Sequence, residues 1–218
     1  NMGSIIWNCY KASCSVSGGT RTTLTAEDIR KSLGHVAEET HTTTFNRPEW
    51  FVRDYSKLSG FCDKWELDAQ QLGLMYDVKE HRVVFPVVHN GVTVDATGRS
   101  LGNRIPKWKR YGKSVLPYSF GRGRTAVVVE DCISAAVVGS GVCVGVAVLG
   151  TSLSNGHKEY LSQFSTAIIA LDPDALPKTL QFAKELRGYV DTVKVLRLTD
   201  DIKYRMPTDM ANLSSLGE

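Results

Sequence analysis

The second half of the chain alternates apolar runs with helix-like segments, and this alternation restricts the fold more than any other feature. Strands rich in Val, Ile and Ala are predicted at 125–130, 142–150, 167–171 and 192–198. Helical patterns fill the gaps between them, at 131–140, 155–164 and 174–188. Strands that are apolar almost throughout are typical of a parallel sheet covered by helices on both faces. The sequence therefore predicts an α/β domain over residues 125–205.

The segments before this domain have a different pattern. Residues 18–45 are rich in Gly and Thr and read as a linker that contains at most one short helix, at 26–33. Two short helices are predicted within 47–60 and 63–74. Two strands are predicted within 82–99, on either side of an Asn-Gly pair that signals a hairpin. We expect mixed α+β structure in this N-terminal subdomain, residues 46–124.

Length and composition also indicate where the protein is located in the cell. The chain has 218 residues and a net charge of +3. No apolar run reaches the roughly 18 residues that a membrane helix needs, and the start lacks the basic-plus-apolar pattern of a signal peptide. We therefore expect a cytoplasmic protein that does not bind a membrane. The polar segment 206–218 is predicted to be a C-terminal tail that leads out of the domain.

A basic stretch lies between the two halves, because no acidic residue occurs between Asp95 and Glu130. The cations of this stretch are Arg99, Arg104, Lys107, Lys109, Arg110, Lys113, Arg122 and Arg124. The aromatic residues among them are Trp108, Tyr111, Tyr118 and Phe120. Cations that hold phosphates, beside rings on which bases stack, favour a nucleic-acid surface. The alternative is a solvated basic loop, which is common.

Carboxylates follow two strands of the predicted parallel sheet. Glu130 ends the first strand, and Asp172 and Asp174 end the third. Ligands of such sheets gather at the carboxyl ends of the strands, and side chains two apart in an extended segment point to the same side. Crowded carboxylates repel one another and raise their pKa values unless a cation lies between them, and Mg²⁺ prefers such oxygen ligands. Alternatively, Asp-Pro-Asp starts a helix, with one aspartate as the N-cap.

With these motifs, residues 125–186 resemble a Toprim domain, the catalytic unit of bacterial-type DNA primases, topoisomerases and some nucleases. Its signature is a glutamate after the first strand and Asp-x-Asp after the third, matched by Glu130, Asp172 and Asp174. The segment LGTSLS at 149–154 resembles a primase segment, and Lys178 falls where primases carry a lysine. The resemblance implies a Rossmann-like parallel sheet flanked by helices.

Upstream segments resemble bacterial-type, DnaG-like primases in particular, and compact tailed-phage versions most of all. Residues 82–112 are similar to a Phe-Pro to Pro-Lys-Tyr segment of the basic primase subdomain, in which Arg99 and Lys107 match residues that face the template or nucleotide. Residues 1–17 resemble the last strand pair of a primase zinc ribbon and so read as its remnant. Cys9 and Cys14 are its candidate zinc ligands, and Zn²⁺ is expected only if the first half of the ribbon lies outside this chain.

The sequence departs from the primase pattern at three places. Ser134 stands where primases usually carry an aspartate, and the neighbouring Asp131 is an open candidate for its replacement. Cys9 and Cys14 are separated by four residues instead of two. The last acidic motif of the family is only loosely matched by Asp200 and Asp201, which are candidates for a second metal position or simply surface turn residues.

The resemblance implies the catalytic core of a DNA primase, which joins ribonucleoside triphosphates into a short RNA primer on a single-stranded DNA template. Mg²⁺ or Mn²⁺ is the implied cofactor, and a replicative helicase is an implied partner. The implied nucleotide- or template-binding residues are Arg99, Arg104, Lys107, Lys109, Arg110, Lys113 and Lys178. Two alternatives stay open: a Toprim-type metal-dependent nuclease, and a non-catalytic fragment that binds single-stranded DNA or a helicase.

Overall fold

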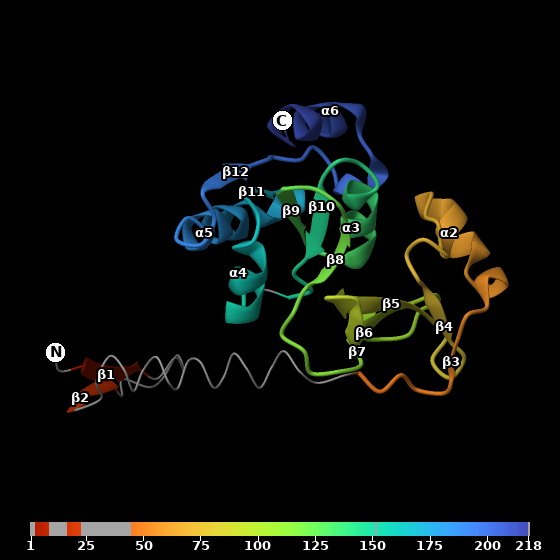
Figure 1. Cartoon of the computed structure of the whole chain (residues 1–218), viewed down its shortest axis with the longest axis horizontal. Helices are drawn as coiled ribbons and strands as arrows, with labels where there is room; N and C mark the ends of the chain where they lie inside the picture. The colour runs from red at the N-terminus through yellow and green to blue at the C-terminus, as the bar shows by residue number, and fades with distance from the viewer. Residues whose placement is uncertain (1–2, 9–16, 23–44, 151, 218) are drawn as a thin grey trace. The chain divides into compact units, whose positions relative to one another are not determined.

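The computed structural model describes residues 3–8, 17–22, 45–150 and 152–217 (Figure 1). The chain divides into two compact units, residues 1–42 and residues 43–218. The described part of the first unit is an antiparallel pair of strands, β1 (Gly3–Asn8) and β2 (Ser17–Thr22).

Strand β2 covers the beginning of the segment that was predicted to be a linker. Gly3 lies opposite Thr22, and Asn8 lies opposite Ser17. The backbone of 17–22 therefore has a pairing partner that a linker would lack. Cys9, Cys14 and the helix predicted at 26–33 lie outside the described residues.

The second unit begins with an antiparallel five-stranded sheet whose order follows the chain, β3-β4-β5-β6-β7. Its strands are β3 (Phe51–Val52), β4 (Met75–Asp77), β5 (Arg82–His89), β6 (Val92–Ser100) and β7 (Trp108–Arg110). The predicted hairpin is confirmed between β5 and β6, and its turn residues Asn90 and Gly91 both have positive φ, at 49° and 77°, as a tight two-residue hairpin turn requires.

The two helices predicted between 47 and 74 are replaced by one short helix. The 3₁₀ turn η1 (Tyr55–Lys57) precedes α2 (Ser59–Trp65). The first predicted helix is wrong in its N-terminal half because Phe51 and Val52 pair with β4. The second is wrong because Asp68 accepts hydrogen bonds from the amides of Gln70 and Gln71, at 2.8 and 2.9 Å, and so folds its own segment into turns.

The predicted α/β domain contains a five-stranded sheet of order β12-β11-β9-β10-β8. Its strands are β8 (Tyr118–Gly121), β9 (Thr125–Val129), β10 (Val144–Ala147), β11 (Thr166–Ile169) and β12 (Thr192–Val195). The four predicted strands are parallel, whereas β8 pairs antiparallel with β10 at one edge. The predicted α/β class is confirmed, with β8 as an addition from the basic stretch.

Helices cover both faces of this sheet (Figure 1). Successive residues of each strand point to opposite sides, so neighbouring strand residues contact different helices. Ala126 and Val128 pack with α4 (Asn155–Leu161) and α5 (Leu176–Leu186). Val127 and Val129 pack with α3 (Cys132–Gly139) and α6 (Pro207–Gly217). The core on the α3 side also contains residues of α2 and β5, so the two sheets of the second unit share one core.

Helix α6 corrects the prediction of a tail that leaves the domain. Asp209 in its first turn is buried and accepts hydrogen bonds from the amide and the hydroxyl of Thr199, the latter at 2.8 Å. Leu213 is buried, and Met210 and Leu216 pack against the same core. The apolar side chains are spaced by three residues, so they share one helix face that folds back onto the sheet. No helix in the described part of the chain is long and apolar enough to span a membrane.

Candidate functional site

A cavity of about 760 Å³ lies within the second unit, where both of its sheets contribute side chains. The antiparallel sheet contributes residues of β6 and β7, and helix α2 contributes Lys64 and Trp65. The α/β sheet contributes the residues after β9, β10 and β11, and the segment around the 3₁₀ turn η3 (Ile202–Tyr204) adds more. The cavity therefore lies at the carboxyl edge of a parallel sheet, where ligands of such sheets usually bind.

Two of the predicted catalytic carboxylates line this cavity. Glu130 follows β9 and Asp172 follows β11, and these strands are parallel neighbours. Both side chains are partly buried. Burial, with the nearby negative charges of Asp201 and Glu130, raises the pKa of Asp172 to about 6. Asp172 makes no side-chain hydrogen bond to the following turn, so it does not act as the helix cap that the sequence left open.

Asp174 does not line the cavity with Asp172. The backbone of Asp172 is extended, but the next residue begins the 3₁₀ turn η2 (Pro173–Ala175). The expectation that both aspartates face the same side assumes an extended segment through 174, and this turn replaces that segment. Asp174 is exposed and is absent from the cavity lining.

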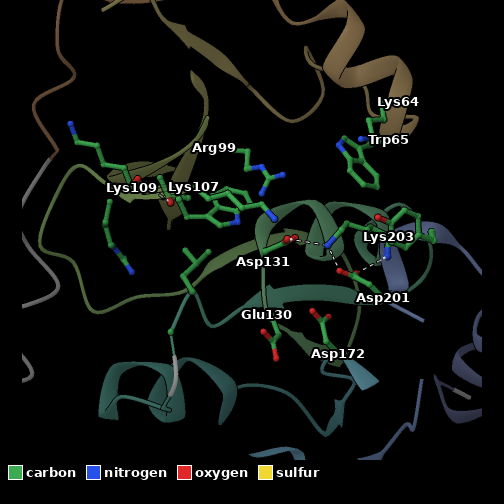
Figure 2. Close-up of a pocket in the computed structure, with 16 residues that line it drawn as sticks. Lys64, Trp65, Arg99, Lys107, Lys109, Glu130, Asp131, Asp172, Asp201 and Lys203 are labelled. Atoms are coloured by element: carbon green, nitrogen blue, oxygen red, sulfur yellow. Dashed lines mark hydrogen bonds and ion pairs between the residues drawn. The ribbon is translucent and has the colours of Figure 1, made fainter. Parts of the chain in front are cut away.

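A second acidic pair in the cavity encloses a lysine, as Figure 2 shows. Lys203 Nζ lies 3.3 Å from Asp131 Oδ2 and also forms an ion pair with Asp201. Burial opposes the charge of Lys203, but Asp131 and Asp201 outweigh it and raise its pKa above the ordinary value. Ser134, which departs from the primase pattern, donates its hydroxyl to Asp201 at 3.1 Å.

The opposite side of the cavity is basic. Arg99 from β6 and Lys107, Lys109 and Arg110 from the β7 segment all line it. The Arg99 guanidinium lies 5.5 Å from the ring centre of Trp108, and burial lowers its pKa despite the nearby Asp131. Lys109 is paired with Glu80, and Arg110 with the buried Asp95 at 2.7 Å. Arg99 and Lys107 are consequently the cations of this group for which no ion pair is seen among the described residues.

The other predicted binding residues lie outside the cavity lining. Arg104 and Lys113 are exposed on the surface. Lys178 stands at the border of the cavity, with its Nζ 3.7 Å from Glu130 Oε1 and 3.0 Å from the carbonyl oxygen of Gly150. Asp200 is exposed, and its carboxylate accepts a hydrogen bond from the Asp201 amide at 2.7 Å.

The aromatic residues of the basic stretch have mainly structural roles. Tyr118 is buried in the shared core. Tyr111 donates its hydroxyl to Asp77 at 2.6 Å and packs edge-on against Phe51. The prediction that these rings stack on bases is therefore wrong for Tyr118, because its ring is buried in the core. Tyr111 is partly buried, and its ring and hydroxyl are already engaged with Phe51 and Asp77. Trp108, by contrast, lines the cavity.

The cavity offers few oxygen ligands for a divalent cation. Among the described residues, no three His, Cys, Asp or Glu side chains lie close enough together to hold a metal ion by themselves. Mg²⁺ commonly uses only one or two carboxylates and completes its shell with water and substrate phosphates. Glu130 and Asp172 provide such a pair, and the pKa of Asp172 is raised first by burial and then by the nearby charges of Asp201 and Glu130. The residues are therefore compatible with a two-carboxylate Mg²⁺ or Mn²⁺ site.

Sequence reasoning did not identify Lys203, Lys64, Trp65 or Tyr204 as site residues. They come from α2 and η3, which contact the cavity only through the tertiary fold. Their local sequence carries no phosphate or metal motif. The sequence suggested Asp131 only as a possible substitute for the aspartate that primases carry at the position of Ser134. The structure places Asp131 in the cavity.

Comparison with solved structures identifies the architecture. The structure of the DnaG primase catalytic domain bound to single-stranded DNA superposes with a TM-score of 0.62 at 14% identity, over 86% of this chain and 78% of that one. The DnaG catalytic core gives 0.58 at 12% identity, over 88% and 79%. The chain has the fold of the DnaG primase catalytic core.

The primase-core fold extends to a third structure, with a weaker match. A DNA primase domain from Pseudomonas aeruginosa gives a TM-score of 0.50 at 19% identity, over 75% of this chain and 62% of that one. No family model and no curated protein matches the sequence. At these identities the comparison establishes the fold, and it confirms the resemblance to primases that the sequence motifs indicated.

Proposed function

We propose that this chain is the catalytic core of a DNA primase, which synthesises short RNA primers from ribonucleoside triphosphates on single-stranded DNA. The observation that carries the proposal is one cavity that combines Glu130 and Asp172 with Arg99 and Lys107. Carboxylates on one side and cations on the other suit a reaction between a metal-bound triphosphate and a polynucleotide. The fold match to a primase domain bound to single-stranded DNA supports the same assignment.

The carboxylates that would hold Mg²⁺ or Mn²⁺ are Glu130 and Asp172. When bound, such an ion neutralises triphosphate charge and activates the primer 3′ hydroxyl. Lys178, 3.7 Å from Glu130, stands where it can orient that carboxylate or bind an incoming phosphate. Asp174 and Asp200 stay predictions as metal ligands, because both are exposed and neither lines the cavity.

The basic side of the cavity binds the phosphates of the template and the incoming nucleotide. Arg99 and Lys107 are available for this role because no ion pair occupies them in the described structure. Trp108 and Trp65 line the same cavity and provide aromatic faces on which bases can stack. Binding of this kind is strongly dependent on salt.

We also propose a partial zinc site and a helicase partner. Cys9 and Cys14 are proposed as half of a zinc site, whose other ligands this sequence does not contain in ribbon spacing. A replicative helicase is proposed as a partner because primers are needed where a duplex is opened. Both proposals rest on the sequence resemblance.

The test is incorporation of labelled ribonucleotides on single-stranded DNA with Mg²⁺ or Mn²⁺. Asp172→Asn removes one carboxylate of the site, and Asp191→Asn serves as the control because Asp191 is exposed and outside the cavity. We expect short RNA products from the wild type and the control, and none from Asp172→Asn. Cleavage of the template without synthesis would indicate a Toprim-type nuclease. DNA binding that is equal in all three proteins, without synthesis or cleavage, would indicate a binding fragment.

A further inference from the structure

The cavity holds four carboxylates, but they are not equivalent. Glu130 and Asp172 follow parallel strands, whereas Asp131 and Asp201 are both paired with Lys203 (Figure 2). The side chains of this triad are 13–16% exposed. The triad is therefore an internal ion pair cluster at the border of the site rather than a surface contact.

The two carboxylates of the triad are held in place by other donors. Asp131 Oδ1 caps α3 by accepting the amides of Ile133 and Ser134, each at 3.0 Å. Asp201 Oδ1 accepts the Ser134 hydroxyl at 3.1 Å and the Lys203 amide at 3.2 Å. In each carboxylate, one oxygen is bound by these groups and the second oxygen faces the Lys203 ammonium. Every carboxylate oxygen of Asp131 and Asp201 therefore already has a donor within the protein.

The lysine is also held by its surroundings. Its Nζ lies 5.8 Å from the ring centre of Trp65 and 6.0 Å from that of Tyr204, within the range of cation–π attraction. Two carboxylates and two rings therefore enclose a single ammonium group. Moving Lys203 out would leave Asp131 and Asp201 as uncompensated, partly buried charges, which is costly.

We propose that the Lys203 ammonium is a fixed cation of the site, which occupies the place between Asp131 and Asp201 that a second divalent ion would otherwise take. The chain then binds one divalent ion, at Glu130 and Asp172, and supplies the other positive charge from its own side chain. This inference rests on the proposed function for the position of the first ion.

The experiment counts bound Mn²⁺ by electron paramagnetic resonance, with no nucleotide or DNA present. Mn²⁺ is chosen because it prefers oxygen ligands, so Cys9 and Cys14 contribute little. The wild type should bind one ion, and Lys203→Met, which exposes both carboxylates, should bind two. Lys203→Arg keeps the charge and should bind one.

Two further variants keep the test decisive if Lys203→Met does not fold. Asp172→Asn should weaken Mn²⁺ binding more than about tenfold, as loss of a ligand does. Asp201→Asn should change it within about threefold, because Asp201 is already paired with Lys203. A loss as large for Asp201→Asn as for Asp172→Asn would overturn the inference.

The number of bound Mn²⁺ ions tests this inference separately from the proposed function. Two ions bound by the wild type, or one ion bound by folded Lys203→Met, would overturn the role of Lys203 and leave the primase assignment intact. A wild type that binds no Mn²⁺ would overturn the placement of an ion at Glu130 and Asp172, and with it this inference. A wild type that binds one ion but makes no primers would contradict the proposed function alone.

Discussion

Replacing Asp172 by Asn should stabilise the protein while it strongly weakens metal binding. The pKa of Asp172 is raised from 3.8 to about 6 by burial and by the charges of Asp201 and Glu130. The ionised carboxylate therefore costs folding free energy at neutral pH. A shift of about two units corresponds to at most about 3 kcal/mol. Because the side chain is only partly buried, solvent screening reduces this to about 1–2 kcal/mol.

The stabilisation by Asp172→Asn should depend on pH in a defined direction. Because the pKa of Asp172 is higher in the folded than in the unfolded chain, the folded wild type binds an extra proton between about pH 4 and pH 6. The stability of the wild type, relative to the Asn variant, therefore rises as the pH falls through 6. The advantage of the variant should be full at pH 7.5 and nearly absent at pH 4.

Thermal unfolding followed by circular dichroism in EDTA measures this difference. For a unit of this size, 1–2 kcal/mol corresponds to a rise in Tm of roughly 2–8 °C at pH 7.5. Asp191→Asn, at an exposed position, should leave the Tm unchanged. Added Mg²⁺ should raise the Tm of the wild type and the control but not of Asp172→Asn, because ligand binding stabilises only a protein that binds it.

The reasoning would be refuted by an Asp172→Asn variant that is no more stable than the wild type at pH 7.5. It would also be refuted by a gain that persists undiminished at pH 4, since the carboxyl group of the folded protein is then neutral and no longer carries the cost of ionisation. Either result would mean that the crowding of carboxylates does not determine the energetics of this site.

Three other substitutions test the parts of the fold that position the cavity. Asp95 is fully buried and accepts hydrogen bonds from Arg110 and three backbone amides; Asp95→Ala should lower the unfolding free energy by about 3–5 kcal/mol in urea titrations, and a loss below about 1 kcal/mol would contradict this. A Cβ at Gly145 would overlap the carbonyl oxygen of Ala135; Gly145→Ala should cost roughly 1–3 kcal/mol in the same assay, so an equally stable variant would refute the close packing of α3 on β10. Lys107→Ala should weaken single-stranded DNA binding for all sequences and reduce the salt slope by about 0.7, measured by fluorescence anisotropy at several salt concentrations; an unchanged slope would exclude a phosphate contact.

Much of the fold could be predicted because it depends on local patterns. The strand and helix order from 125 to 198 follows from apolar runs and amphipathic spacing, and the turn at Asn90 follows from the conformational freedom of Asn-Gly. The meeting of Glu130 and Asp172 was also predictable, since the carboxyl ends of parallel strands lie at one edge of a sheet. Edge strand β8 and the pairing of Phe51 with β4 were missed, because short strands are defined by their partners.

The sequence alone determined the parallel sheet, its covering helices and the pair of carboxylates at its edge, because short-range periodicity encodes which residues each strand and helix buries. Only the tertiary structure decided which charges would meet in the cavity. Lys203 lies 72 residues from Asp131 along the chain, and no local pattern relates them. The burial of Tyr118 and the return of α6 to the sheet depend likewise on long-range packing. The charge balance of the site is thus a property of the folded chain, set by contacts that the order of residues does not display.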